Sequence, residues 1–504
     1  VLKLTISTRS LAKLFYTKMF AVYSQSREMT NLMSLAVLLL ATSTLLEALV
    51  LAGDNSVLEV WITTGDGHKK LSHESSVHAS QGTNGGQLVT VNRNRHYQTV
   101  DGFGAAISNS AAYVIYHSPQ RHEIMQNLFG CSGIGINYIR LTMGGSDLQA
   151  VPPYTYDDLP SGETTDFNLN HFNIGKDREF IIPILKEAIS INPKLKILGS
   201  PWTAPAWMKT SHSLFGGAFR AEDRYYQALS QYILKFIQAY AAEGFPIDSI
   251  TIQNEPMLSR DSYPTMTMSW ENQRDLVKTY LGPLFKSHNV KTKIIIFDHN
   301  WSGSDYPDHI LADSTASSFI AGVAWHCYEG RHDTPLYFHD KHPNVGMYFT
   351  ECSGGGWDTN FAGTLVFDMR NLFIGQTRAF AKTVLLWNLA LDEHSGPKVG
   401  VHGCQDCRGV VTVNSNGGYQ KNIEYYSIGH MSKFVQPGAI RLESPYFGWD
   451  DLHTVAFKNP DESVVIVVVN ANSGHAKSFT IELDGKHFHY NNLPNQSVVT
   501  FILK

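Results

Sequence analysis

The chain has 504 residues, of which 43% are hydrophobic and 17% charged, with a formal net charge of -5 at pH 7 and a pI near 6.5. This is the balance of an ordinary globular protein, and the length fits one large domain or two to three smaller ones. The weak acidic charge argues against a nucleic-acid-binding surface or a polybasic membrane patch. No nucleic-acid partner is therefore expected.

Residues 1–52 have the character of an export leader. Met29 is a candidate start, and the apolar run 32–46 has the length of a signal-peptide core, with small residues near Ala52 for cleavage. An uncleaved anchor is the alternative, because 35–52 approaches the ~18 residues that span a bilayer, and an artefact of gene prediction is another. Glu47 and the lack of a basic flank favour cleavage. Residues 1–52 are therefore set apart from the fold.

Residues 97–430 alternate short apolar runs with helical patterns. Helices are predicted at 180–189, 225–240 and 273–285, where apolar residues recur at helical spacing. The predicted strands are 101–107, 136–143, 195–200, 249–254, 293–297, 323–327, 345–350 and 384–388. Continuous apolar strands are typical of parallel sheets covered on both faces. Eight of them predict a TIM (β/α)8 barrel. The alternative is a doubly wound sheet, but no G-x-G-x-x-G or P-loop follows the first strand.

The flanks of this region predict β-structure. Strands are expected at 57–63, 88–91, 454–457, 463–469, 479–483 and 498–502, with turn residues between the later ones. The early strands can join the late ones in a single β-sandwich. We therefore expect N-terminal sandwich strands in 53–96, the barrel in 97–430 and the rest of the sandwich in 431–504.

Five cysteines are present, so at least one thiol stays unpaired within the chain. Cys404 and Cys407 have C-x-x-C spacing, which suits a zinc half-site, a redox pair or a local disulfide. No second C-x-x-C supplies the other half of a zinc site, and a disulfide is favoured in an exported chain. The sequons at Asn300 and Asn495 are compatible with export.

Two glutamates stand where a barrel carries its chemistry. Glu255 follows the predicted fourth strand and Glu351 the seventh, and functional residues of a barrel gather after strand carboxyl ends. Glycoside hydrolysis needs such a pair, one carboxyl to protonate the leaving oxygen and one carboxylate to attack the anomeric carbon. Asn254 is placed to hydrogen-bond a sugar hydroxyl, and Trp202 and Trp387 offer flat faces to sugar rings.

Four motifs resemble glycoside hydrolase family 30, in the branch that contains glucosylceramidase. They are Asp101-Gly102-Phe103-Gly104, Ser200-Pro201-Trp202-Thr203, Asn254-Glu255-Pro256 and Trp387-Asn388-Leu389-Ala390-Leu391. The resemblance runs from about residue 97 to the end of the chain. It implies a retaining mechanism with Glu255 as acid/base and Glu351 as nucleophile. It also implies a substrate-binding set of Asp147, Trp202, Asn254, Tyr263, His326, Tyr328 and Trp387.

Some of these residues have a second interpretation. Arg140 either holds a carboxylate beneath the substrate or forms a salt bridge at the barrel end. His326 is either a substrate contact or a buried core histidine, and Tyr328 is placed to hydrogen-bond the nucleophile. No cofactor is expected, and no metal site, because the sequence shows no convergent set of His and Asp ligands.

The aglycone is the open question. The resemblance implies hydrolysis of glucosylceramide, with a glycolipid or β-glucan as substrate and an activator protein or a membrane surface as a further contact. The segment 403–412, with Cys404 and Cys407, looks more like microbial, fungal and invertebrate members, some of which cut β-1,6-glucans. The alternatives are therefore an endo-β-1,6-glucanase or another β-glucosidase or β-xylosidase of the family, and remotely a non-catalytic glycan-binding relative. The expected location is the secretory pathway, lysosomal or extracellular.

Overall fold

The computed structural model describes residues 37–38, 56–400 and 403–504. Contacts divide the chain into two compact units, Val1–Ser56 and Val57–Lys504, and the fold described below is that of the second unit. The predicted leader lies outside the described residues except at two positions. Among the described residues, no helix combines the length and the hydropathy needed to cross a membrane.

Eight parallel strands close into a barrel in the order β10-β12-β4-β5-β6-β7-β8-β9. They are β4 (Gly102–Ile107), β5 (Tyr138–Thr142), β6 (Lys196–Ser200), β7 (Ser249–Thr251), β8 (Lys293–Asn300), β9 (Ile320–His326), β10 (Gly346–Glu351) and β12 (Ala381–Leu386). All eight predicted strands are confirmed, with their ends shifted. Nearly every position in them is buried, because the barrel interior and the surrounding helices cover both faces of each strand.

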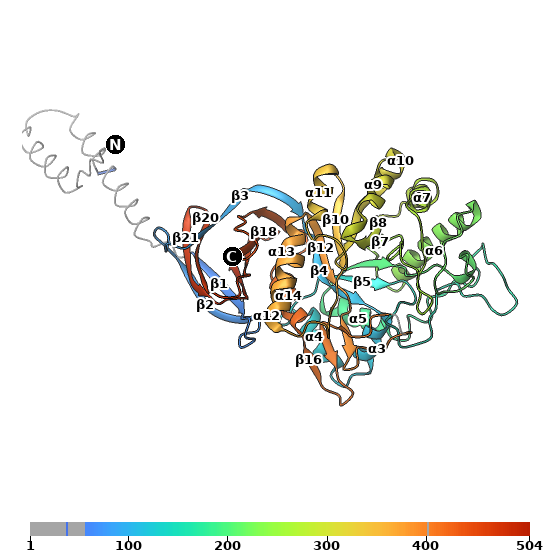
Figure 1. The fold of residues 1–504 in the computed structure, drawn as a ribbon, viewed down its shortest axis with the longest axis horizontal. Helices are drawn as coiled ribbons and strands as arrows, with labels where there is room; N and C mark the ends of the chain where they lie inside the picture. The colour runs from blue at the N-terminus through green and yellow to red at the C-terminus, as the bar shows by residue number, and fades with distance from the viewer. Residues whose placement is uncertain (1–36, 39–55, 401–402) are drawn as a thin grey trace, which may run out of the picture. The chain divides into compact units, whose positions relative to one another are not determined.

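Helices surround this barrel (Figure 1). They are α3 (Asn109–His117), α4 (Arg121–Phe129), α5 (Ile181–Ile191), α6 (Asp223–Ala242), α7 (Trp270–Asp275), α8 (Gly282–Ser287), α9 (Asp305–Leu311), α10 (Ser314–Ser317), α11 (Thr334–Lys341), α12 (Phe361–Phe367), α13 (Ile374–Arg378) and α14 (Ile423–Ser432). Short 3-10 turns are Ala206–Met208 and Trp301–Gly303, and π-helical turns are Leu276–Leu281 and Asp368–Phe373.

The predicted helix at 273–285 is interrupted. A π-helical turn, Leu276–Leu281, joins α7 to α8, and Pro283 stands in the first turn of α8. Proline has no N–H and collides with the carbonyl four residues before it, so a wider turn ahead of it relieves the clash. The other two predicted helices correspond to α5 and α6.

Strands from both chain ends form the β-sandwich. Figure 1 shows the early strands β1, β2 and β3, in blue, beside the late strands β18, β20 and β21, in red. The nine strands are hydrogen-bonded in the cyclic order β1-β2-β21-β20-β3-β17-β18-β19-β22. Their bounds are β1 (Val57–Thr63), β2 (Ser72–Ser80), β3 (Gln87–Thr99), β17 (Ile440–Glu443), β18 (Leu452–Lys458), β19 (Val464–Asn470), β20 (Lys477–Leu483), β21 (Lys486–Leu493) and β22 (Ser497–Leu503).

Three of these strands, β2, β17 and β21, were not predicted. β2 and β21 are rich in Ser, His and Asn, and most of their residues are partly or fully exposed. Without one buried face they lack the apolar alternation that identifies a strand in a sequence. β17 has only four residues.

Two small sheets are separate from the barrel and the sandwich. One has the order β13-β15-β16 and the other pairs β11 with β14. Their bounds are β11 (Gly354–Gly355), β13 (Ala390–Asp392), β14 (Cys407–Arg408), β15 (Val411–Val413) and β16 (Tyr419–Lys421). The β11–β14 pair places Cys407 opposite Gly355, which brings the C-x-x-C loop to the segment that follows Glu351.

Candidate active site

A cavity of about 280 Å³ lies at the carboxyl ends of the barrel strands, and both glutamates line it. This volume is just below the range typical of small-molecule sites. Its lining consists of Asp147, Trp202, Asn254, Glu255, Tyr263, Tyr328, Glu351, Ser353, Trp357, Trp387, Cys404 and Cys407. Nine residues were predicted to act on or bind the substrate. Eight of them line this cavity, and the ninth, His326, lies beneath it. Ser353 and Trp357 are the additions that the sequence did not indicate.

Glu255 is held in a strained backbone conformation just after β7. Its φ is +47°, a region that side chains other than glycine seldom adopt. Its N–H donates to the carbonyl of Asp298 at 2.9 Å, which fixes this conformation across the barrel. Such strain persists where the surroundings over-determine it, most often at functional sites.

Glu351 ends β10, where Arg140 and Tyr328 hold its carboxylate. Arg140 on β5 is fully buried, and its Nη1 forms an ion pair with Glu351 Oε2. The Tyr328 hydroxyl donates to Glu351 Oε1 at 2.8 Å. Both oxygens are thus fixed, by a guanidinium beneath and a phenol at the rim. Of the two interpretations of Arg140, the structure shows contact with a carboxylate beneath the cavity, and Tyr328 contacts the same carboxylate.

Asp298 connects the two glutamates from below. Its Oδ2 accepts from Arg140 at 2.7 Å, and its Oδ1 lies 3.0 Å from Nε2 of His326. The other nitrogen of His326, Nδ1, lies 3.3 Å from Glu255 Oε1. Burial opposes a charge on Asp298, but Arg140 and His326 override it and hold the pKa of that carboxyl well below its ordinary value.

His326 is therefore not a wall of the cavity. Its side chain is fully buried, and both ring nitrogens face carboxylates. The expected substrate contact is replaced by a contact with Glu255. Burial lowers the pKa of His326, but Glu351, Asp298 and Glu255 outweigh it and raise the pKa to about 9. For Glu255 the signs are reversed: burial raises the pKa of its carboxyl, but the neighbouring His299 and His326 outweigh burial and hold that pKa below its ordinary value.

A β-bulge in β8 supplies Asp298 and His299. The pairing with β9 shifts register between Phe297 and His299, and Phe297 and Asp298 have φ of +74° and +68°. Neighbouring residues of a regular strand point to opposite faces, whereas a bulge re-aims them. Both side chains can therefore reach the site. Neither was predicted, although the polar run from Asp298 to Asn300 follows an apolar strand, which is a signal for a site.

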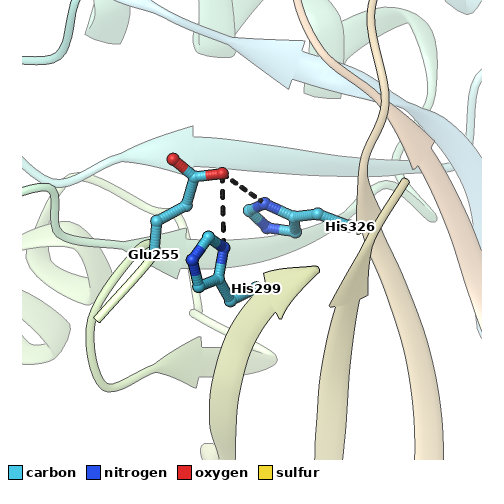
Figure 2. Close-up of side chains that lie close together, drawn as sticks. All are labelled: Glu255, His299 and His326. Atoms are coloured by element: carbon cyan, nitrogen blue, oxygen red, sulfur yellow. Dashed lines mark hydrogen bonds and ion pairs between the residues drawn. The ribbon is translucent and has the colours of Figure 1, made fainter. Parts of the chain in front are cut away.

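His299 brings a third group to Glu255. Figure 2 shows His299 and His326 with both rings directed at the same carboxylate oxygen of Glu255. The Nδ1 of His299 lies 3.5 Å from Glu255 Oε1. One atom from each of the three residues, in a form that can ligate a metal, lies within 4.8 Å of the others. The sequence showed no convergent set of metal ligands, and here the structure differs, because the bulge places His299.

Two tryptophans and two polar groups form the inner wall of the cavity. Trp202 and Trp387 stack with centroids 5.0 Å apart and an interplanar angle of 25°. Asn254 Oδ1 accepts from Arg140 at 2.6 Å, so its Nδ2 is the group left to donate to a ligand. Asp147 accepts from the N–H of Cys404 at 3.2 Å, and burial raises the pKa of Asp147 to about 7.

Two disulfides border the cavity. The predicted bond between Cys404 and Cys407 is present. A second, between Cys327 and Cys352, was not predicted; it joins the segments that follow β9 and β10. Cys131 is a free, exposed thiol, in agreement with the odd count.

One outward-facing aromatic and one buried sequon complete the surroundings. Trp357 is 56% exposed at the rim of the cavity. Asn300 is only 9% exposed, and its Oδ1 accepts from the N–H of Tyr328 at 3.1 Å. The sequon at Asn300 is therefore buried in the folded protein. Asn495 is exposed in the turn before β22.

Comparisons with known proteins agree with the fold. Residues 100–435 match the glycosyl hydrolase family 30 TIM-barrel domain, and residues 438–501 match the glycosyl hydrolase family 30 beta sandwich domain. The solved structure of the endo-beta1,6-glucanase BT3312 has a TM-score of 0.81 and 34% identity, covering 88% of this chain and 99% of that one.

Two curated relatives differ in their named substrates. The endo-1,6-beta-D-glucanase neg1 of Aspergillus fumigatus is 34% identical over 432 residues, covering 81% of this chain and 86% of the relative. The lysosomal acid glucosylceramidase of Mus musculus is 30% identical over 431 residues, covering 79% of this chain and 81% of the relative.

Proposed function

The chain belongs to glycosyl hydrolase family 30, and from this premise we propose that it is a retaining endo-β-1,6-glucanase. The observation that supports the chemistry is that the carboxylates of Glu255 and Glu351 line one cavity at the carboxyl ends of the barrel strands. Retaining glycosidases act through a pair of carboxyl groups that flank the bond to be cut. The protein is accordingly a glycoside hydrolase, and the roles of the residues below are part of the proposal.

Glu351 acts as the nucleophile. Its carboxylate attacks the anomeric carbon of the sugar in the cavity, the bond to the leaving oxygen breaks, and a glycosyl–enzyme ester forms. The ion pair with Arg140 and the hydrogen bond from Tyr328 orient the carboxylate for this attack. Both groups are directed at Glu351 and not at Glu255, which supports this assignment over the reverse one.

Glu255 acts as the general acid and then as the general base. It gives a proton to the leaving oxygen, and later takes one from the water that hydrolyses the ester, so that the product keeps the β configuration. Before the sugar binds, the proton is on His326, whose pKa is raised to about 9, and Glu255 is ionised. A bound sugar excludes water, which disfavours the separated charges and moves the proton to the carboxyl.

The inner wall binds the sugar whose bond is cut. Trp202 and Trp387, which line the cavity, contact the ring, the Nδ2 of Asn254 donates to a hydroxyl, and Asp147 accepts from others. A cavity of about 280 Å³ accommodates a single sugar unit better than a stretch of chain. The rest of the glucan therefore leaves the cavity past the exposed Trp357.

The choice of glucan over glycolipid rests on the relatives. The sequence alone placed glucosylceramide first and β-1,6-glucan second. The two endo-1,6-glucanases are 34% identical to this chain, and the mouse glucosylceramidase 30%, which reverses the order. A glycolipid substrate, with an activator protein or membrane contact, becomes the second candidate, favoured by the identity to the mouse enzyme.

The test compares two substrates. Purified protein is incubated with pustulan, a β-1,6-glucan, and with glucosylceramide in detergent micelles, and Glu351→Gln serves as the inactive control. We expect soluble β-1,6-oligosaccharides of several lengths from pustulan and little glucose from the lipid. NMR of the first products should show the β anomer before mutarotation. Glucose released chiefly from glucosylceramide would refute the glucanase assignment and leave the glycosidase chemistry intact.

Entry into the secretory pathway is also part of the proposal. Two disulfides, Cys327–Cys352 and Cys404–Cys407, need an oxidising compartment, and Asn495 offers an exposed sequon. Expression in a eukaryotic cell should yield protein in the medium or lysosome whose mass falls after N-glycan removal. Asn495→Gln should abolish this fall.

A further inference from the structure

The Glu255, His299 and His326 group has the geometry of a metal site. Their three ligand atoms lie within 4.8 Å of one another. The Oε1 of Glu255 is 3.5 Å from Nδ1 of His299 and 3.3 Å from Nδ1 of His326. Tetrahedral zinc has bonds of about 2.0–2.2 Å to His nitrogen and Glu oxygen, which places neighbouring ligand atoms about 3.3–3.5 Å apart. Both distances fall in this range.

The surroundings support the same interpretation. Nε2 of His326 lies 3.0 Å from Asp298 Oδ1, and a carboxylate behind the far nitrogen of a histidine is the usual outer partner of a metal ligand. His299 is 8% exposed, and its Nδ1 makes no hydrogen bond among the described residues. A buried nitrogen that faces a carboxylate without a proper hydrogen bond is suited to accept a cation. Figure 2 shows that both rings point to one oxygen.

We propose that Glu255, His299 and His326 bind Zn²⁺ and that the bound ion inhibits the enzyme. Two imidazoles and one carboxylate are a set of donors that binds zinc in proteins, whereas Mg²⁺ and Ca²⁺ require oxygen ligands. Glu255 lines the cavity, so the fourth position of the ion faces the cavity and is filled by water or a sugar hydroxyl. The metal occupies Oε1 and takes the carboxyl out of proton transfer.

The inhibition, though not the binding, rests on the proposed acid/base role of Glu255. Binding is therefore measured separately from activity. Untagged protein freed of metals with a chelator, and then freed of the chelator, is titrated with ZnCl₂ in a calorimeter. Wild type should show one site per chain. His299→Asn should weaken it by at least ~100-fold, and Asp298→Asn by ~10–100-fold through the outer partner.

The matched control is His288→Asn, which removes an exposed histidine at the end of α8 and should bind zinc as wild type does. Mg²⁺ should give no heat at the same concentration. Co²⁺ bound to the wild type should give the strong visible absorption of a tetrahedral site, and His299→Asn should lose it. Equal zinc affinity in wild type and His299→Asn, or a six-coordinate cobalt spectrum, would overturn the site.

Hydrolysis of an aryl β-glucoside is then measured with and without zinc, each variant being compared with its own metal-free rate. Wild type and His288→Asn should lose activity as the site fills, and a chelator should restore it. His299→Asn should resist the same zinc concentration. Zinc that binds through His299 without slowing hydrolysis would support the metal site and refute the acid/base role of Glu255. A failure of the zinc site is thereby distinguished from a failure of the proposed role of Glu255.

Discussion

Arg140 and Asp298 form an ion pair at 2.7 Å with both side chains fully buried. The pair lies under the cavity, and each partner also contacts one side of the proposed catalytic couple. Arg140 contacts Glu351, and Asp298 contacts His326, which in turn contacts Glu255. One buried network therefore sets the position of both carboxylates.

Asp298→Asn should lower activity through this network. The amide keeps the shape but loses the charge, so Arg140 and His326 lose their shared anion. Removing one partner of a buried pair costs about 3–5 kcal/mol of stability, and misplaced catalytic groups cost on the order of 10² in rate. We expect a lower Tm, a fall of kcat of about this size, and a shifted pH profile of kcat/KM, because His326 loses a carboxylate that raises its pKa.

The control for this variant is Asp101→Asn. Asp101 precedes β4 at the amino-terminal end of the barrel and pairs with Lys196 and Lys293. That end of a barrel contributes stability and not catalysis. Asp101→Asn should lower Tm while leaving kcat and its pH profile unchanged. If both variants changed only Tm, Asp298 would be a structural residue.

Substitution of the two glutamates should separate their roles. Glu351→Gln should abolish turnover on every substrate, because no nucleophile remains. Glu255→Gln should slow cleavage of the glucan far more than formation of the glycosyl–enzyme from an activated aryl β-glucoside, since a good leaving group departs without a proton. Burst kinetics with the aryl substrate would measure this. An equal loss for good and poor leaving groups is incompatible with the acid role of Glu255.

Most of the fold could be predicted from the sequence, for a physical reason. Parallel barrel strands are buried on both faces and leave continuous apolar runs, so each strand and the glutamate after it could be placed. The sandwich strands β2 and β21 have no such run, because partners from distant parts of the chain hold them in place. Their pairing cannot be read from local composition.

The site was less predictable where it depends on backbone irregularity. Asp298 reaches Arg140 and His299 reaches Glu255 because of the bulge in β8, which no periodicity in the sequence indicates. The bond between Cys327 and Cys352 could have been predicted: each cysteine directly follows the end of a barrel strand, β9 or β10, and these strands are neighbours. Trp357 lies in a glycine-rich loop whose path only the structure gives.

Trp357→Ala should weaken action on the polymer and spare small substrates. An exposed aromatic ring at the rim of the cavity is suited to stack on the sugar beyond the cut bond, and loss of about 1.4 kcal/mol of binding is a tenfold effect. We expect kcat/KM on pustulan to fall about tenfold and that on an aryl β-glucoside to change little. Tyr337→Ala, which removes an aromatic that is 62% exposed on α11, is the control. A similar fall on both substrates would place Trp357 in contact with the inner sugar.

Asp147→Asn should give a pH-dependent gain in stability together with a loss of activity. Burial raises the pKa of Asp147 from 3.8 to about 7, so between these values the folded protein holds a proton that the unfolded chain releases. The contribution of Asp147 to the free energy of unfolding is therefore greatest below pH 3.8, and it falls as the pH rises toward 7. At about 1.4 kcal/mol per pKa unit, the cost of the buried charge at pH 7.5 is on the order of a few kcal/mol.

The asparagine variant carries no such charge. Its Tm relative to wild type should therefore be higher at pH 7.5 than at pH 3.5 by a few °C, while kcat/KM falls because an acceptor for sugar hydroxyls is lost. Asp340→Asn, an exposed position on α11, controls for the loss of one negative charge. If the Tm difference between Asp147→Asn and wild type were the same at both pH values, the aspartate would not hold a proton in the folded protein. Burial of the charged Asp147 side chain beside Cys404 would then cost no folding free energy at pH 7.5.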